Sequence, residues 1–309
     1  MASPSPFAPA IEHSVRGILL RIGSASAFGV MAALLKLAND RGVLASEMVF
    51  YRALFAMPVV IAWLLTGPGL GAIRTRRPFA HLGRAALGIS SVLCTFKALT
   101  LLSLADATTI GFTAPIFATI FSALILREHV GRHRWLAVAI GFVGMLIVVH
   151  PGASGTLPRD GLLIALLAAV GTAGVTITLR QISTTEHVAA IVFWFFLCSI
   201  VCGAVLLLFV GRSHSPGVYA ILGAAGVAGG IAQLLMTGSL RFASVAVVAP
   251  FDYIQLLWAI ALGWLLFASV PLATTLIGAL LIAASGLYTV WREHRRRALA
   301  SLISAGALE

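Results

Sequence analysis

The chain has 309 residues, of which 60% are hydrophobic and only 10% carry a charge, with a mean hydropathy of +1.03. A soluble domain carries about 25% charged residues, so this composition excludes a soluble globular protein and predicts a polytopic membrane protein. The net charge of +11 does not indicate a nucleic-acid partner, because the arginines gather in short loops beside apolar segments, where they report membrane topology.

Ten apolar segments follow one another along the chain, separated by short connections that hold the turn and charge signals. Most come close to the roughly 20 residues that a helical membrane span needs. No connection is long enough to form a soluble domain, and the polar first 16 residues show no cleaved targeting segment. The sequence therefore predicts an all-α integral membrane protein with ten transmembrane helices. The predicted spans are 17–37, 47–66, 82–103, 107–126, 134–150, 160–180, 188–210, 216–240, 243–267 and 270–291.

Lysine and arginine are distributed unevenly between the two sides of these segments. With both termini in the cytoplasm, the outer side holds only Arg41, Arg159 and Arg212. This asymmetry predicts that both termini are cytoplasmic. A bacterial inner (plasma) membrane is the expected location. The 15 basic residues on the inner side are Arg16, Arg21, Arg74, Arg76, Arg77, Arg84, Arg127, Arg132, Arg134, Arg180, Arg241, Arg292, Arg295, Arg296 and Arg297.

The second half of the chain repeats the first. Residues 17–36 match 161–180 at a constant offset of 144, and residues 105–126 resemble 243–266. Five spans in each half would place the second half upside down relative to the first, as in alternating-access transporters with a site between the halves. The predicted organisation is a cytoplasmic tail (1–16), a first repeat (17–150), an outer linker (151–159), a second repeat (160–292) and a basic cytoplasmic tail (293–309).

Asp252 lies well inside the ninth apolar segment. It is the only acidic residue in the sequence that lies well inside an apolar segment. A carboxylate at that depth costs a few kcal/mol and usually faces a cavity or a charged partner. A neutral, hydrogen-bonded acid that only fixes helix packing is the alternative. We predict that Asp252 binds the solute or takes up a proton.

Two cations lie within spans, Lys97 in the third and Arg52 in the second. Either could extend its charged end to the outer interface. Lys97 is the deeper of the two, so it is predicted to face a cavity, with Asp252 or Asp106 as candidate partners. Arg52 is included among the predicted substrate-binding residues.

Aromatic and amide side chains accompany these charges. Tyr253, Gln255 and Trp258 follow Asp252 closely and are predicted to form the wall of a pocket for an amphiphilic solute. Pro115 and Pro250 interrupt the fourth and ninth spans, and such breaks in transporters supply backbone polar groups and points of bending. A static kink is the alternative for both prolines.

Motifs for other chemistry are missing from the sequence. His129 and His133 are four residues apart but lack the HExxH pattern of a zinc site, and no phosphate-binding GxxxxGK[ST] motif occurs. The three cysteines all lie within spans, where they are interpreted as packing residues. No catalytic residue, metal or cofactor is predicted.

The most specific motifs are Leu-Ala-Asp-Ala-Thr at 104–108 leading to Thr-Ala-Pro-Ile-Phe at 113–117, and Val-Ala-Pro-Phe-Asp-Tyr at 248–253 with Gly-Trp-Leu-Leu-Phe at 263–267. In these motifs the chain resembles the drug/metabolite transporter superfamily, in particular its ten-span EamA-type members. The family commonly has Gly-Glu after the last motif. Glu128 retains the acid in the first repeat, whereas Ala268 and Ser269 replace the pair in the second.

The resemblance implies ten helices around a central cavity and alternating-access transport of a small organic metabolite. The favoured solute is an amino acid or related zwitterion, with protons as a candidate coupling ion. The alternatives are a cofactor-type solute such as riboflavin or S-adenosylmethionine, or, from another class, a membrane-embedded enzyme or scaffold subunit. The expected partners are the solute and membrane lipids, with no nucleic acid, and the chain is expected to be a monomer or homodimer.

Overall fold

The computed structural model describes residues 8–125, 131–149, 158–182, 185–242 and 248–306, and these are helical with no strand among them. The α-helices and two short 3₁₀ helices (η) are α1 (Ala8–Asn39), α2 (Ala45–Thr66), η1 (Leu70–Ile73), α3 (Pro78–Leu101), α4 (Leu104–Gly111), α5 (Ala114–Leu124), α6 (Arg132–Val149), α7 (Arg159–Ile182), α8 (Val188–Val210), α9 (Pro216–Phe242), η2 (Ala249–Tyr253), α11 (Ile254–Phe267) and α12 (Ala273–Gly306).

Seven helical segments in the described part of the chain are long and apolar enough to cross a membrane. The remaining apolar helices cover residues 135–148, 251–267 and 273–289 and are shorter. The all-helical membrane fold is therefore confirmed, while the total of ten spans and the inverted relation of the halves stay predictions. Each predicted span falls on helical structure among the described residues, with the fourth divided between α4 and α5.

The two halves of the chain interleave rather than form separate bodies. The most extensive contacts join α1 to α9, α3 to α7 and α6 to α12, so each joins a helix of the first half to one of the second. Small residues permit this approach in lipid. A Cβ at Gly226 of α9 would lie 2.5 Å from the Cβ of Phe55, and a Cβ at Gly144 of α6 would lie 2.9 Å from the carbonyl oxygen of Gly278 in α12.

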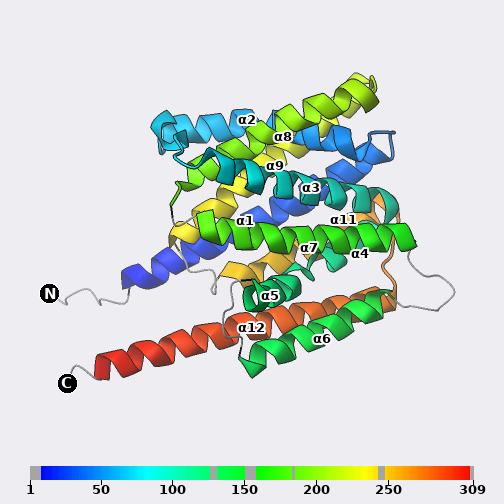
Figure 1. Ribbon diagram of the computed structural model, residues 1–309. Helices are drawn as coiled ribbons and strands as arrows, with labels where there is room; N and C mark the ends of the chain where they lie inside the picture. Colours follow the sequence, from blue (N-terminus) through cyan, green and yellow to red (C-terminus); the bar gives the residue numbers. More distant parts are fainter. Residues whose placement is uncertain (1–7, 126–130, 150–157, 183–184, 243–247, 307–309) are drawn as a thin grey trace.

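Both chain termini lie at the same end of the bundle, which we call the terminal end (Figure 1). The opposite end, where α6 ends and α7 begins, is the linker end. Helices α2, α8 and α9 form one side of the molecule, α6 and α12 form the other, and α1, α3, α4, α7 and α11 lie between them.

Two helices of this middle layer are broken. The helix that begins at Leu104 ends at Gly111, and α5 starts at Ala114 with Pro115 in its first turn. Proline has no N–H to offer the carbonyl four residues earlier, which belongs to Gly111, so the break falls where this hydrogen bond is lost. The backbone around Pro250 forms the short η2 helix before α11 begins at Ile254. Both predicted interruptions are present, whereas their role in gating stays a prediction.

Candidate functional site

The two broken helices border two adjoining cavities. The terminal cavity, of about 180 Å³, lies nearer the terminal end, and the central cavity, of about 210 Å³, lies deeper. The terminal cavity is lined by Phe112, Pro115, Ile116, Thr119, Ala137, Val138, Asp252, Tyr253, Ser285, Gly286 and Thr289. The central cavity is lined by Met31, Ala32, Thr95, Phe96, Leu99, Ala107, Thr108, Gly111, Phe112, Thr172 and Gln255.

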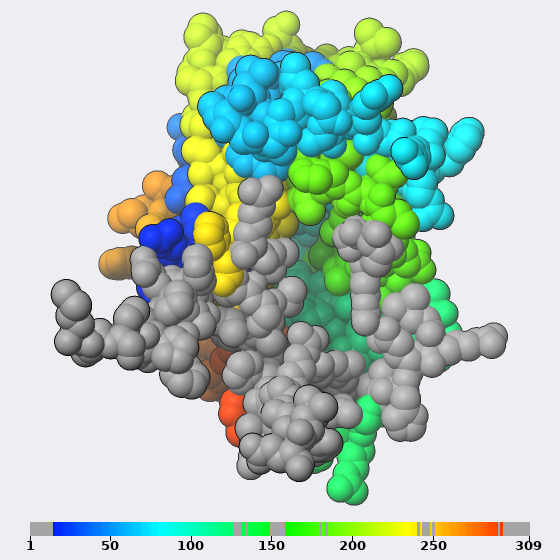
Figure 2. All heavy atoms as spheres, turned by 90° about the vertical axis from the view of Figure 1, so that its left-hand side faces the viewer, coloured from blue at the N-terminus to red at the C-terminus, as the bar shows by residue number. Residues whose placement is uncertain are grey.

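Phe112 borders both cavities and lies at the break between α4 and α5. Its ring centroid is 4.9 Å from that of Tyr253, at the end of the other break. Phe112 therefore stands between the two cavities, with the Tyr253 ring against it on the side of the terminal cavity. On the face at the terminal end (Figure 2), teal atoms of the α3–α5 region are visible deep between the yellow atoms of α9 and the green atoms of α7.

Asp252 forms a two-pronged ion pair with Arg21 of α1. Nε and Nη2 of Arg21 each donate to one carboxylate oxygen, both at 2.5 Å, across 231 positions of sequence. The side chain of Arg21 is 12% exposed and that of Asp252 is 36% exposed. The pair joins α1 to η2 beside the terminal cavity and leaves the carboxylate partly accessible.

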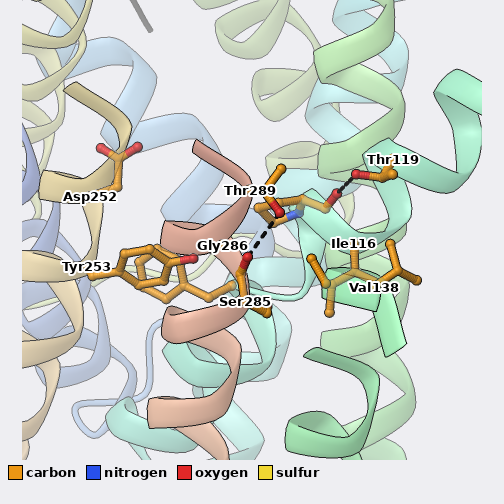
Figure 3. A pocket seen from close by; sticks show the side chains of 11 residues that line it. Ile116, Thr119, Val138, Asp252, Tyr253, Ser285, Gly286 and Thr289 are labelled. Carbon is orange, nitrogen blue, oxygen red and sulfur yellow. Dashed lines mark hydrogen bonds between the residues drawn. The ribbon is translucent and has the colours of Figure 1, made fainter. Parts of the chain in front are cut away.

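Tyr253 points its hydroxyl directly at the backbone of Gly286 in α12 (Figure 3). A Cβ at position 286 would collide with this hydroxyl, so the ring fits only because the residue opposite is glycine. Ser285 and Thr289 flank Gly286 on the same helix, and the Thr289 hydroxyl donates to the Ser285 carbonyl at 3.0 Å. The wall of the terminal cavity thus combines an aromatic face with small polar residues.

The central cavity is lined mostly by apolar atoms and by hydroxyl groups that act as acceptors. The Thr95 hydroxyl donates to the Ser91 carbonyl at 2.9 Å, and the Thr108 hydroxyl donates to the Leu104 carbonyl at 2.7 Å. Because each hydroxyl has one proton, its oxygen lone pairs are what it offers to a ligand. Gln255 adds an amide, which supplies both donors and an acceptor.

Arg52 lies immediately behind this wall. Its side chain is buried, with the guanidinium carbon 5.8 Å from the ring centroid of Phe96 and 5.5 Å from that of Phe196. Nε of Arg52 has no hydrogen-bond partner among the residues described. Phe96 separates the cation from the central cavity, so the predicted contact between Arg52 and solute would require this ring to move.

Lys97 does not join the site in this structure. Residues two apart on a helix point in nearly opposite directions, and both Thr95 and Leu99 line the central cavity. Lys97 is exposed on the other side of α3. The pairing considered between Lys97 and Asp252 is not formed, because Arg21 holds the carboxylate.

The other suggested partner of Lys97 is also engaged elsewhere. Asp106 accepts hydrogen bonds from the hydroxyls of Ser103, at 2.6 Å, and of Thr275 in α12, at 2.7 Å. A role for Lys97 in substrate binding stays a prediction that this arrangement does not support.

The remaining predicted residues are divided between the cavities and the helix contacts. Asp252, Tyr253 and Pro115 line the terminal cavity and Gln255 lines the central cavity. Trp258 lines neither: its indole N–H donates to the Ser26 hydroxyl at 2.8 Å and fixes α11 against α1. The structure therefore brings four of the eight predicted residues to the cavities. The side chain of Pro250 lies outside the described residues.

Sequence reasoning missed two residues at the centre of the site, Arg21 and Phe112. Arg21 was counted only as a topology signal, although it lies within the first predicted span and so would need a partner there. Phe112 precedes Pro115 by three residues, and the break that the proline forces is the feature that could have directed attention to it.

Several known proteins are similar to the chain over most of its length. The model of the EamA-like transporter family matches residues 15–150 and again residues 159–291. The pseudopaline exporter of Pseudomonas aeruginosa is 30% identical over 87% of this chain and 94% of its own length. The riboflavin transporter of Rhizobium johnstonii is 31% identical over 79% and 78%, respectively. The S-adenosylmethionine uptake transporter of Rickettsia conorii is 24% identical over 81% and 84%.

A solved structure titled only as the crystal structure of a protein superposes with a TM-score of 0.61. It is 20% identical in sequence and covers 88% of this chain and 98% of its own. At that identity the likeness establishes the fold alone.

Proposed function

Because the chain belongs to the EamA-like transporter family, we propose that it moves a small organic metabolite across the membrane through the terminal and central cavities. The observation that carries this proposal is the placement of both cavities at the two helix breaks. Asp252 lines the terminal cavity and Gln255 lines the central cavity. Sites formed at discontinuous helices near the middle of the bilayer are typical of secondary transporters.

The solute class follows from the walls of the cavities. The aromatic pair of Phe112 and Tyr253 suits a flat or ring-shaped part of a solute. Asp252 and the acceptor oxygens of Thr95 and Thr108 suit an ammonium or N–H group. The named relatives transport pseudopaline, riboflavin and S-adenosylmethionine, which supports a larger organic metabolite over the free amino acid that the sequence favoured.

The Arg21–Asp252 pair gives a physical step for transport. A cationic group of the solute would take the carboxylate and release Arg21, which would free α1 from η2. Protonation of Asp252 would release the same contact, so protons are the candidate coupling ion. At the linker end, Lys36 joins α1 to the end of α3 by donating to the carbonyls of Leu99 and Leu102 at 3.0 and 2.7 Å. By the arginine distribution the terminal end faces the cytoplasm.

Counterflow in proteoliposomes tests the proposal. Vesicles holding the purified protein are loaded in turn with unlabelled riboflavin, S-adenosylmethionine or an amino acid, and uptake of the same labelled solute is followed. We expect uptake with riboflavin or S-adenosylmethionine at least several-fold above that of protein-free vesicles.

If only an amino acid were taken up, the result would support the amino-acid solute that the sequence favoured. If no solute accumulates although circular dichroism shows a folded helical protein, the proposed solute class is wrong. In that case the enzyme or scaffold alternative gains support.

A further inference from the structure

A third cavity, outside the proposed transport path, lies between the terminal-end segments of α3 and α7. It has a volume of about 230 Å³ and is lined by Arg77, Phe79, Ala80, Gly83, Arg84, Thr178, Gln181 and Ile182. Its lining shares no residue with either of the other two cavities. We call it the α3–α7 pocket.

Arg84 is the buried charge of this pocket. Its side chain is only 7% exposed, and its guanidinium lies 4.3 Å from the ring centroid of Phe195 in α8. Neither Nε nor Nη1 has a hydrogen-bond partner, and none of the described carboxylates lies within 4 Å. An unpaired buried cation is costly, and most are compensated by an anion.

Glu186, an acid beside the start of α3, does not provide that anion. One of its carboxylate oxygens is 3.3 Å from Nε2 of His81 and the other accepts from the backbone N–H of Arg76 at 3.3 Å. Its hydrogen bonds are directed to these groups rather than to Arg84. The positive charge of the α3–α7 pocket is therefore not neutralised by the described part of the protein.

The surroundings of the pocket indicate where the missing anion would come from. Arg77 is exposed at the pocket mouth, where its Nη1 donates to the Thr185 hydroxyl at 3.3 Å. Phe79, next to it, is 85% exposed. An apolar ring this exposed can pack against lipid chains, while arginines beside it at a helix start can reach the headgroups.

From these observations we propose that the α3–α7 pocket binds a phosphate group, and specifically the headgroup phosphate of an anionic phospholipid from the leaflet at the terminal end. Arg84 contacts the phosphate from inside, Arg77 contacts it at the mouth, and Phe79 packs against the glycerol and the upper acyl chain. Basic pockets between helices on the cytoplasmic side recognise anionic headgroups in this way. The site shares no lining residue with the proposed transport path.

The test uses the full-length protein in a neutral detergent and does not depend on transport. Thermal unfolding is followed while dioctanoyl phosphatidylglycerol, dioctanoyl phosphatidylcholine or inorganic phosphate is added. A ligand that binds only the folded state stabilises it by RT ln(1 + c/Kd), where c is the free ligand concentration, so the apparent Tm rises as this concentration exceeds Kd. We expect phosphatidylglycerol to raise the Tm, and phosphatidylcholine and phosphate to leave it unchanged.

Two variants locate the effect. Arg84→Gln should abolish the phosphatidylglycerol shift, whereas Arg74→Gln, an exposed arginine outside the pocket, should keep it. Arg77→Gln serves if Arg84→Gln does not fold, and it should weaken phosphatidylglycerol binding about fivefold, as expected for one arginine near the membrane surface.

Three results would overturn the proposal. An equal shift with inorganic phosphate would assign the pocket to a free anion, and an equal shift with phosphatidylcholine would remove the charge requirement. A phosphatidylglycerol shift that is unchanged in the Arg84 variant, or an affinity that is unchanged in the Arg77 variant, would place the lipid elsewhere.

Discussion

The two ends of the bundle use their charged residues in different ways. At the linker end, Glu47 is fully buried and its carboxylate is bonded on both oxygens. One oxygen accepts from the backbone N–H of Leu44 at 2.7 Å, and the other lies 2.8 Å from the backbone nitrogen of Arg212 and 3.0 Å from Nε2 of His214. These contacts join α2 to the start of α9.

The terminal end also has a buried pair, His81 and Glu186, but two other charged groups there are less fully paired. There the Arg21–Asp252 pair is partly exposed beside a cavity, and Arg84 has no partner for two of its nitrogens. A buried polar group whose hydrogen bonds are all made fixes one structure, whereas an exposed pair or an unpaired cation can take up a ligand. The comparison suggests that the linker end supplies rigidity and the terminal end supplies binding.

The largest effect should come from Glu47→Ala. This change leaves the Arg212 and Leu44 N–H groups without an acceptor in a buried place, so we expect the free energy of unfolding to fall by about 3 kcal/mol. Thermal unfolding in detergent measures the loss. Asp160→Asn, an exposed acid at the same end, is the control and should change the Tm little; equal losses in both variants would contradict the contrast.

Asp252→Asn should act on transport rather than on stability. Loss of the charge removes both the Arg21 contact and the proposed contact with solute, and a loss of about 1.4 kcal/mol of binding corresponds to a tenfold lower affinity. Counterflow should fall at least tenfold while the Tm changes by only a few degrees. Asp40→Asn, at the exposed end of α1, should transport normally. Wild-type transport by the Asp252 variant would refute the role given to this acid.

A stabilising change is expected at Ala268, where α11 ends at the linker end. Ala268 has a φ of 48°, the left-handed conformation that glycine adopts without strain, and it ends the helix through hydrogen bonds from Ala268 N–H to Trp264 O and from Ser269 N–H to Gly263 O. Ala268→Gly should therefore raise the free energy of unfolding by about 1 kcal/mol. Ala261→Gly, within the same helix, should lower it by a similar amount. A lower Tm for Ala268→Gly would show that the strain is absent.

The smallest expected effect is the pH dependence of stability that Glu186 contributes at the terminal end. Burial would raise the pKa of Glu186, but hydrogen bonds from His81, Thr75 and the Arg76 N–H outweigh it and hold the pKa below the ordinary value of 4.5. The stabilisation by this carboxylate is therefore complete above pH 4.5 and lost as the pH falls through the lower, folded-state pKa. Glu186→Gln should reduce the Tm slightly at pH 7, with a difference that narrows on acidification. If the Tm difference between wild type and Glu186→Gln instead widened below pH 4.5, the predicted pH dependence would be wrong.

Much of the fold was predictable because hydrophobic length and proline position act locally. The predicted spans fall on helices, and the breaks near Pro115 and Pro250 fall where a proline removes a helical hydrogen bond. The left-handed turn at Ala268 also gives a physical reason for the glycine that the family commonly has there, because glycine alone adopts it freely.

The site was less predictable because its contacts are long-range. Nothing local to Arg21 or Asp252 indicates that residues 231 positions apart will meet. The direction of Lys97 depends on which side of α3 packs inward, and hydrophobicity does not settle this in a membrane, where the lipid-facing side is apolar as well. Depth within a span was therefore a useful guide for Asp252 and a poor one for Lys97.

The most direct test of the transport account is solute protection of one cysteine in the central cavity. Thr108→Cys is introduced after Cys94, Cys198 and Cys202 are replaced by alanine, and its reaction with a maleimide added from the terminal side of the membrane is timed with and without riboflavin or S-adenosylmethionine. We predict labelling from that side and a several-fold slower reaction when the transported solute is present. A labelling rate that the solute leaves unchanged, in protein that still transports it, would show that the solute does not occupy this cavity.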